Sequence, residues 1–128
     1  MKALLDTHIW IWYLVGDARL KATHRRVIQD PAAEIWLSAI SIWETHMLIE
    51  RKRLRVRVTP EAWIEQALRT LSVREAPITF RIAALSRRMD IPHSDPADRF
   101  IAATAAVMDI PLLTADEALA GCSDIVVK

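Results

Sequence analysis

Four acidic residues of this 128-residue chain stand where they could build a site for phosphoester chemistry. Asp6 directly ends the apolar run 3–5, and Asp116 follows the run 112–113 after a two-residue turn. If the two runs are parallel strands, both carboxylates leave the sheet at the same edge. In open parallel sheets, ligands bind just beyond that edge, at the carboxyl ends of the strands.

The other two acids, Glu44 and Asp98, stand near expected helix starts that would face the same edge. Each also has a simpler interpretation. Glu44 follows Ser41 with the spacing of a capping box, in which the Glu closes its own helix start. Asp98 follows Asp95 and Pro96, an N-cap followed by a proline in the first turn. Taken singly, each acid is more simply explained by capping.

Taken together, the four acids indicate a bound cation. Two carboxylates about 6 Å apart repel by roughly 3 kcal/mol at an effective dielectric constant near 20. Four at one edge are therefore unfavourable unless some are protonated or a cation binds. Oxygen ligands select Mg²⁺ or Mn²⁺, and such an ion can polarise a phosphoryl oxygen and activate water. The residues thus predict divalent-metal phosphoester chemistry.

The composition is that of a compact, helix-rich protein, with 52% hydrophobic residues, five Trp and only two Gly. We expect one domain over residues 1–128. The single cysteine, Cys122, excludes an internal disulfide and a Cys-based zinc site, and it fits a reducing cytoplasm. A net charge of +1 leaves any attraction to nucleic acid to a local patch. No apolar run is long enough to span a membrane, and Asp6 interrupts the N-terminal run too early for a signal peptide. We therefore expect a soluble cytoplasmic protein.

Short apolar segments alternate with segments of helical periodicity along the chain. Strands are expected at 3–5, 35–37, 111–113 and 125–127, and helices over 18–29, 38–51, 60–71, 79–89 and 96–109. The helix over 96–109 has the clearest 3.6-residue period. This alternation predicts an α/β fold with a parallel sheet covered on both faces.

Four sequence blocks in this order resemble PIN-domain ribonucleases and, more narrowly, the VapC toxins of type II toxin–antitoxin modules. The blocks are Leu5-Asp6-Thr7-His8, residues 38–44, residues 93–99 with 101–105, and Leu113-Thr114-Ala115-Asp116. The resemblance covers essentially the whole chain. It implies a three-layer α/β/α sandwich around a central parallel sheet.

The resemblance also implies roles for the acids and their neighbours. The metal-binding and catalytic carboxylates would be Asp6, Glu44, Asp98 and Asp116, the last acting directly or through water. They would hold Mg²⁺, with Mn²⁺ as an alternative. Supporting roles would fall to Thr114, which orients Asp116 or a bound water, to Asp95, which is either a supporting acid or only an N-cap, and to Arg99, paired with a neighbouring carboxylate.

The activity implied is hydrolysis of RNA phosphodiesters by metal-activated water, leaving 5′-phosphate and 3′-hydroxyl ends. The implied partners are an RNA substrate, a second copy of the chain and a VapB-like antitoxin that covers the acidic groove. The alternatives are a housekeeping ribonuclease, or a catalytically degenerate PIN-fold module that binds RNA or protein. A phosphatase with an aspartyl nucleophile is disfavoured, because the second Asp it usually needs is replaced by His8.

A basic segment could contact RNA or the antitoxin through Arg51, Lys52, Arg53, Arg55 and Arg57. Phosphate contacts of this kind give salt-dependent affinity. A solvated loop at the negative end of a helix dipole explains the same residues, as does a short edge strand. The five Trp could stack unpaired bases, but packing in the core or in a dimer interface is the simpler interpretation. His8 and His93, next to motif acids, could touch phosphate or metal, although each is more simply a hydrogen-bonding neighbour.

Overall fold

The computed structural model describes residues 1–92, 95–122 and 126–128. Within this part of the chain, four strands form one sheet with the order β3-β2-β1-β4. Every pairing is parallel. The strands are β1 (Lys2–Leu5), β2 (Glu34–Ser38), β3 (Arg74–Ala76) and β4 (Leu112–Leu113). The predicted parallel sheet is therefore confirmed.

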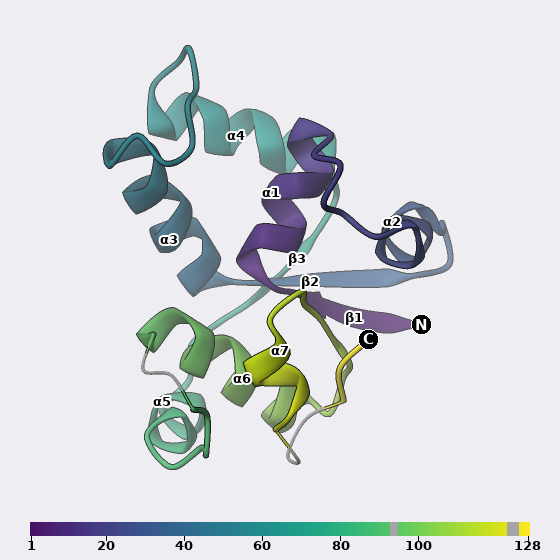
Figure 1. Ribbon diagram of the computed structural model, residues 1–128, viewed down its shortest axis with the longest axis vertical. Helices are drawn as coiled ribbons and strands as arrows, with labels where there is room; N and C mark the ends of the chain where they lie inside the picture. The colour runs from purple at the N-terminus through teal and green to yellow at the C-terminus, as the bar shows by residue number, and fades with distance from the viewer. Residues whose placement is uncertain (93–94, 123–125) are drawn as a thin grey trace.

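Helices cover both faces of this sheet, which gives the three layers expected (Figure 1). On one face lie α1 (Thr7–Val15), α2 (Ala22–Gln29), α3 (Ala39–Glu50) and α4 (Pro60–Thr70). On the other lie α5 (Phe80–Ser86), α6 (Pro96–Met108) and α7 (Glu117–Ala120). None of the helices in the described residues is long and apolar enough to cross a membrane.

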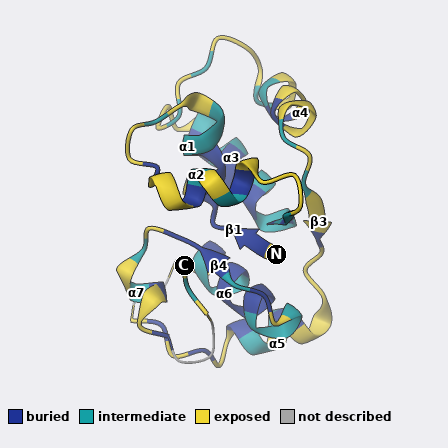
Figure 2. Ribbon diagram, turned by 90° about the vertical axis from the view of Figure 1, so that its right-hand side faces the viewer, coloured by how far each residue is buried: buried dark blue, intermediate teal, exposed yellow. Residues whose placement is uncertain are grey.

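The alternation of side chains along β1 divides the core into two clusters. Ala3 and Leu5 belong to the cluster under α1 to α4, together with the fully buried Trp10. Leu4 belongs to the cluster on the opposite face, with Ile101 of α6. Burial of one such large side chain contributes about 1.5–3 kcal/mol. Figure 2 shows β1 as buried, and the strand ends at Leu5, directly before the buried Asp6.

Several predicted boundaries shift in the structure. The helix predicted over 18–29 begins only at Ala22, and the one over 79–89 extends from Phe80 to Ser86 with Thr79 as its N-cap. The basic segment forms turns and loop after α3, so its interpretation as an edge strand is wrong. Residue 125 of the predicted last strand lies outside the described residues, while Val127 forms an isolated bridge with Leu112.

The edge strand β3 was not predicted. It contains only Arg74, Glu75 and Ala76, without the apolar run that marks the inner strands. Short, charged strands are usual at a sheet edge, because they discourage pairing with another chain. The local sequence signal is therefore weakest where the sheet meets solvent.

Candidate metal centre

Asp6 occupies the junction between β1 and α1. Its backbone N–H still donates to Leu113 O (2.9 Å), so the sheet ladder extends to this residue. Its Oδ1 caps α1 by accepting the Thr7 backbone N–H at 2.8 Å, and its Oδ2 accepts the Thr114 hydroxyl at 2.6 Å. Burial raises the pKa of Asp6, against the opposing effect of these two hydrogen bonds. The sheet and two neutral donors thus hold a buried carboxyl group in one orientation.

Glu44 reaches the same region from α3. The capping-box interpretation of Glu44 is wrong, because the N-cap is Ser38, whose hydroxyl accepts the Ile40 N–H at 3.1 Å. Ser41 lies inside the helix and shares a 2.8 Å hydrogen bond with the Thr7 hydroxyl, which ties α3 to the start of α1. Glu44 is therefore free of a capping role.

The environment of Glu44 is unfavourable for an isolated charge. The side chain is buried, and in the described part of the chain its Oε1 has no hydrogen-bond partner. Burial raises the pKa of Glu44, and the charges of Asp95 and Asp6 raise it further, whereas the Thr7 hydroxyl lowers it. A buried carboxylate oxygen without a donor is costly unless a cation or a proton satisfies it.

Asp98 stands in the first turn of α6, and its environment shows most directly that the acids lie close together. The N-cap of this helix is Asp95, whose Oδ1 accepts the Ala97 N–H at 3.0 Å, as predicted. The pKa of Asp98 is raised to about 8, first by burial and then by the charges of Asp6, Asp95, Asp116 and Glu44. The acids that the sequence distributes over four elements therefore act on one another.

Asp116 completes the group from the end of β4. It is the N-cap of α7, a helix that was not predicted, and its Oδ1 accepts the Ala118 N–H at 2.9 Å. Its own N–H donates to Thr114 Oγ1 at 3.0 Å. Thr114 thus links the Asp6 carboxylate to the Asp116 backbone, whereas the resemblance had implied that it orients the Asp116 side chain or a water.

These carboxylate oxygens fit a hard divalent cation that retains part of its water shell. Within the described ranges, no group of three or more acidic, histidine or cysteine side chains is already arranged so that it could hold a metal ion. Mg²⁺ commonly keeps several waters and uses only one or two carboxylates directly. The unsatisfied Glu44 Oε1 and the raised pKa of Asp98 are what such an ion would relieve. If such an ion binds, Asp6, Glu44 and Asp98 are its candidate ligands.

One expected neighbour of the acids, Arg99, has other partners. The described hydrogen bonds of the Arg99 guanidinium go to carbonyl oxygens of Ser86 (3.3 Å), Met89 (2.9 Å) and Ile91 (3.4 Å), not to a carboxylate. Arg99 therefore fixes the chain between α5 and α6. His8 is exposed and remains close to the acids, because its charge lowers the pKa of both Asp6 and Glu44. His93 lies outside the described residues.

Sequence reasoning missed Thr7 as a supporting residue. Thr7 is fully buried, gives its backbone N–H to Asp6, and acts through its hydroxyl on Ser41 and Glu44. The available signal was its position: a small polar residue directly after a strand-ending acid.

The amino-acid sequence is similar to a known family and to a known ribonuclease. The family model described as "PIN domain" matches residues 3–122. Ribonuclease VapC22 from Mycobacterium tuberculosis is 34% identical over 119 residues, which cover 91% of this chain and 88% of that protein.

Solved structures agree with the fold. VapBC2 from Rickettsia felis, bound to a DNA fragment from its promoter, superposes with a TM-score of 0.73 at 12% identity over 100% of this chain and 98% of the other. VapC20 from Mycobacterium tuberculosis, a toxin that cleaves the sarcin–ricin loop, gives 0.65 at 22% identity over 97% and 98%.

Proposed function

Because this chain belongs to the PIN domain family, we propose that it is an endoribonuclease that depends on a divalent metal ion, Mg²⁺ or Mn²⁺. The observation that carries the proposal is the environment of Asp98, whose pKa is raised to about 8 by burial and by four other acids. Such a cluster of carboxylates favours binding of a cation. The ribonuclease activity named for the 34% identical relative gives the reaction class.

The residues of the site have distinct parts in this reaction. When bound, the ion would polarise the phosphodiester and activate water. Asp6 would present a fixed carboxylate, because the Thr114 hydroxyl and the Thr7 N–H hold it. Glu44 would offer its unsatisfied Oε1, and Asp98 would give up its proton as the ion enters. Asp116, which caps α7, would act at the rim of the site.

We further propose that this ribonuclease is the toxin of a type II toxin–antitoxin module. The VapBC complexes among its structural neighbours support a VapB-like antitoxin as partner. Such a toxin would act in the cytoplasm, where its RNA target is found.

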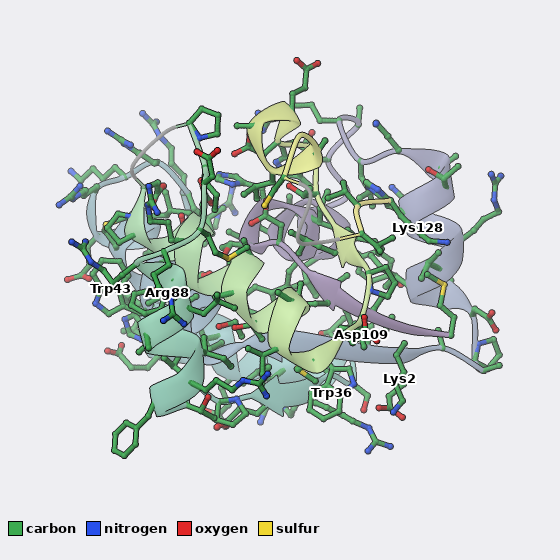
Figure 3. The ribbon with its side chains drawn as sticks, turned by 90° about the horizontal axis from the view of Figure 1, so that it is seen from below. Lys2, Trp36, Trp43, Arg88, Asp109 and Lys128 are labelled. Atoms are coloured by element: carbon green, nitrogen blue, oxygen red, sulfur yellow. The ribbon has the colours of Figure 1, made fainter. Side chains whose placement is uncertain are left out.

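A homodimer fits the apolar side chains that the described structure leaves at the surface. Phe80 is 98% exposed and Trp43 is 59% exposed. Figure 3 shows Trp43 at the periphery of the molecule. A second copy of the chain would cover side chains of this kind, and light scattering of the purified protein would detect it.

Cleavage of RNA by the purified protein tests the proposal. We expect a pool of single-stranded oligoribonucleotides to be cut in millimolar Mg²⁺ or Mn²⁺ and to remain intact in excess EDTA. Asp98→Asn should lose most of this activity while keeping its circular dichroism spectrum. Equal cleavage by the variant, or cleavage unaffected by EDTA, would contradict the site. Growth arrest on expression of the wild type, but not of Asp98→Asn, tests the toxin role separately.

A further inference from the structure

A groove of about 330 Å³ extends from the acidic site between α1 and α3. Glu44 and Asp95 line it together with apolar side chains from both helices, among them Ile11 and Leu48. Arg53 of the basic segment also lines it. The groove therefore connects the candidate metal centre to a cationic part of the surface.

Three side chains, which we call the aromatic wall, form one side of this groove: His8, Trp12 and Arg19. The ring of Trp12 lies 5.9 Å from that of His8, tilted by 54°. The Arg19 guanidinium carbon lies 4.7 Å from the Trp12 ring centroid. Trp12 is half-buried, whereas His8 and Arg19 are exposed, so the aromatic wall is anchored by Trp12 and accessible at His8 and Arg19.

Asp17 holds the Arg19 guanidinium of the aromatic wall in place. Its Oδ2 accepts from Arg19 Nη2 at 2.8 Å, and its Oδ1 accepts from Nε at 3.1 Å and from the backbone N–H at 2.9 Å. A guanidinium fixed in this way loses less freedom when a ligand packs on it. The side chain of Arg19 remains 68% exposed, so a flat group can reach it.

We propose that this groove binds one unpaired nucleotide of the RNA substrate next to the scissile phosphate, with its base against the aromatic wall and a flanking phosphate on Arg53. This inference rests on the proposed ribonuclease function and adds a subsite for one base of the substrate beside the candidate metal centre. Unpaired bases are recognised by stacking on aromatic rings and on Arg guanidinium planes. The apolar floor suits the face of a base, and Arg53 supplies the opposite charge for a phosphate.

The size of the groove favours a single base over an antitoxin helix. Its volume lies at the lower end of the range of roughly 300–1,000 Å³ found for small-molecule pockets. An amphipathic helix instead needs a row of anchoring sites spaced along its length. The acids at one end also repel an RNA phosphate until a cation is bound, so occupation of the groove by RNA would follow metal loading.

Single abasic substitutions test the subsite on the unmodified protein. From a random pool, one oligoribonucleotide that the wild type cuts at a single position is selected, and each nucleotide in turn is replaced by an abasic one. We expect kcat/KM to fall about tenfold when one particular position beside the cut loses its base. Abasic substitutions elsewhere should change kcat/KM by less than about twofold, because those bases do not contact the aromatic wall.

Protein variants then assign that position to the groove. Arg19→Ala should reduce cleavage of the intact RNA about tenfold and should cause no further loss on the RNA that is abasic at the sensitive position. Trp12→Leu should behave in the same way, and Trp12→Phe should recover activity because it keeps an aromatic face. Arg74→Ala is the matched control, since Arg74 lies 5.9 Å from the ring of Trp36, at the other edge of the sheet. Its cleavage should equal that of the wild type.

Each remaining outcome has one meaning. Losses that simply add between Arg19→Ala and the abasic RNA would overturn the subsite while leaving the nuclease intact. Full activity of both Arg19→Ala and Trp12→Leu would also overturn it and leave the groove to a protein partner. If the wild type cuts no single-stranded RNA, the proposed function fails first, and the subsite with it. Thermal unfolding of each variant verifies that it is folded.

Discussion

Carboxylates at the amino ends and at the carboxyl ends of the strands, the amino edge and the carboxyl edge of the sheet, have opposite environments. At the amino edge, where the strands begin, Glu34 lies 3.9 Å from Lys2 Nζ and 3.7 Å from Arg74 Nη2, and it accepts the Trp36 indole N–H at 2.8 Å. Figure 3 shows Lys2 and Trp36 in the same part of the molecule. At the carboxyl edge, Asp6 is held by a hydroxyl and a backbone N–H, and the charges that shift the pKa of Asp98 are those of other acids.

This difference separates Glu34, a structural acid, from the acids that we propose to be functional. Glu34 finds its positive charges within the chain, so its interactions are complete in the folded protein. The acids of the carboxyl edge are buried or half-buried, accept hydrogen bonds only from neutral donors among the contacts described above, and lie close enough to repel one another. This arrangement costs free energy until a proton or a cation binds. A cation at this edge has to come from solution.

The largest expected contrast is in catalysis. Asp6→Asn should lower RNA cleavage by more than about a hundredfold, because loss of a ligand exceeds the 10–100-fold typical of residues that only orient one. Glu34→Gln, a matched change at the amino edge, should cleave RNA at the wild-type rate. Initial rates at equal protein and Mg²⁺ concentrations measure both. Comparable losses in the two variants would remove the distinction between the edges.

Loss of the Thr114 hydroxyl should have the next largest effect. Thr114→Val removes the donor to Asp6 Oδ2 and the acceptor of the Asp116 N–H. Because the hydroxyl orients a ligand, we expect metal affinity to fall about 10–100-fold. Titration with Mn²⁺ followed by calorimetry measures this change, and Thr114→Ser should restore binding. Unchanged affinity in Thr114→Val would show that Asp6 needs no such support.

Metal should stabilise the fold through the carboxyl edge alone. An ion at 100 times its Kd adds about 2.7 kcal/mol to the free energy of unfolding. This corresponds to a rise in Tm on the order of 10 °C. Scanning calorimetry with Mg²⁺ or with EDTA should show the rise in the wild type and in Glu34→Gln. It should be absent in Asp6→Asn, and a shift retained there would place the ion elsewhere.

The pH dependence of the metal-free protein follows from Asp98. Its pKa is raised from 3.8 to about 8, so between these values the folded protein keeps a proton that the unfolded chain has released. The free energy of unfolding therefore falls as the pH rises from about 5 to 8. Urea titrations in EDTA should show this fall, and Asp98→Asn should reduce it. Stability that increases across the same interval would contradict the raised pKa.

The smallest expected effect is the contribution of Glu34 to stability. Ion pairs as accessible as those with Lys2 and Arg74 contribute about 0–1 kcal/mol each. Glu34→Gln should therefore lower the free energy of unfolding by about 1 kcal/mol, independently of metal. Urea unfolding with and without Mg²⁺ measures it, and a metal-dependent loss would indicate coupling between the two edges.

What could be predicted from the sequence depended on how strong a local pattern each element carries. The inner strands were visible because each buries a short apolar run, and Asp6 was identifiable because it ends such a run. Glu44 was ambiguous, since Ser38 and Ser41 are both plausible N-caps and only packing against Thr7 decides between them. Local pattern identifies an acid, but tertiary contact decides whether that acid caps a helix or joins a site.

Three elements were missed. The helix α1 is apolar on nearly every face, so it shows no 3.6-residue period. The other two elements have weaker local signals. The edge strand β3 carries charged residues, and α7 is four residues long. The partners of Arg99 are backbone carbonyls, which have no signature in a sequence. The aromatic wall of the groove joins His8 and Trp12 of α1 with Arg19, which lies in the turn after that helix. The position of Arg19 over Trp12 therefore depends on how the turn folds back.

The hydrogen bond between Thr114 and Asp6 joins residues 108 positions apart, and this separation has a consequence for the growing chain. At about 5–20 residues per second, a ribosome adds the intervening segment in about 5 to 20 seconds. Throughout that interval Asp6 is already made but lacks the hydroxyl that orients it, and β1 lacks β4 as a neighbour. A nascent chain therefore cannot complete the site until the segment that carries Thr114 has been made, which delays cleavage of RNA beside the ribosome that makes the enzyme.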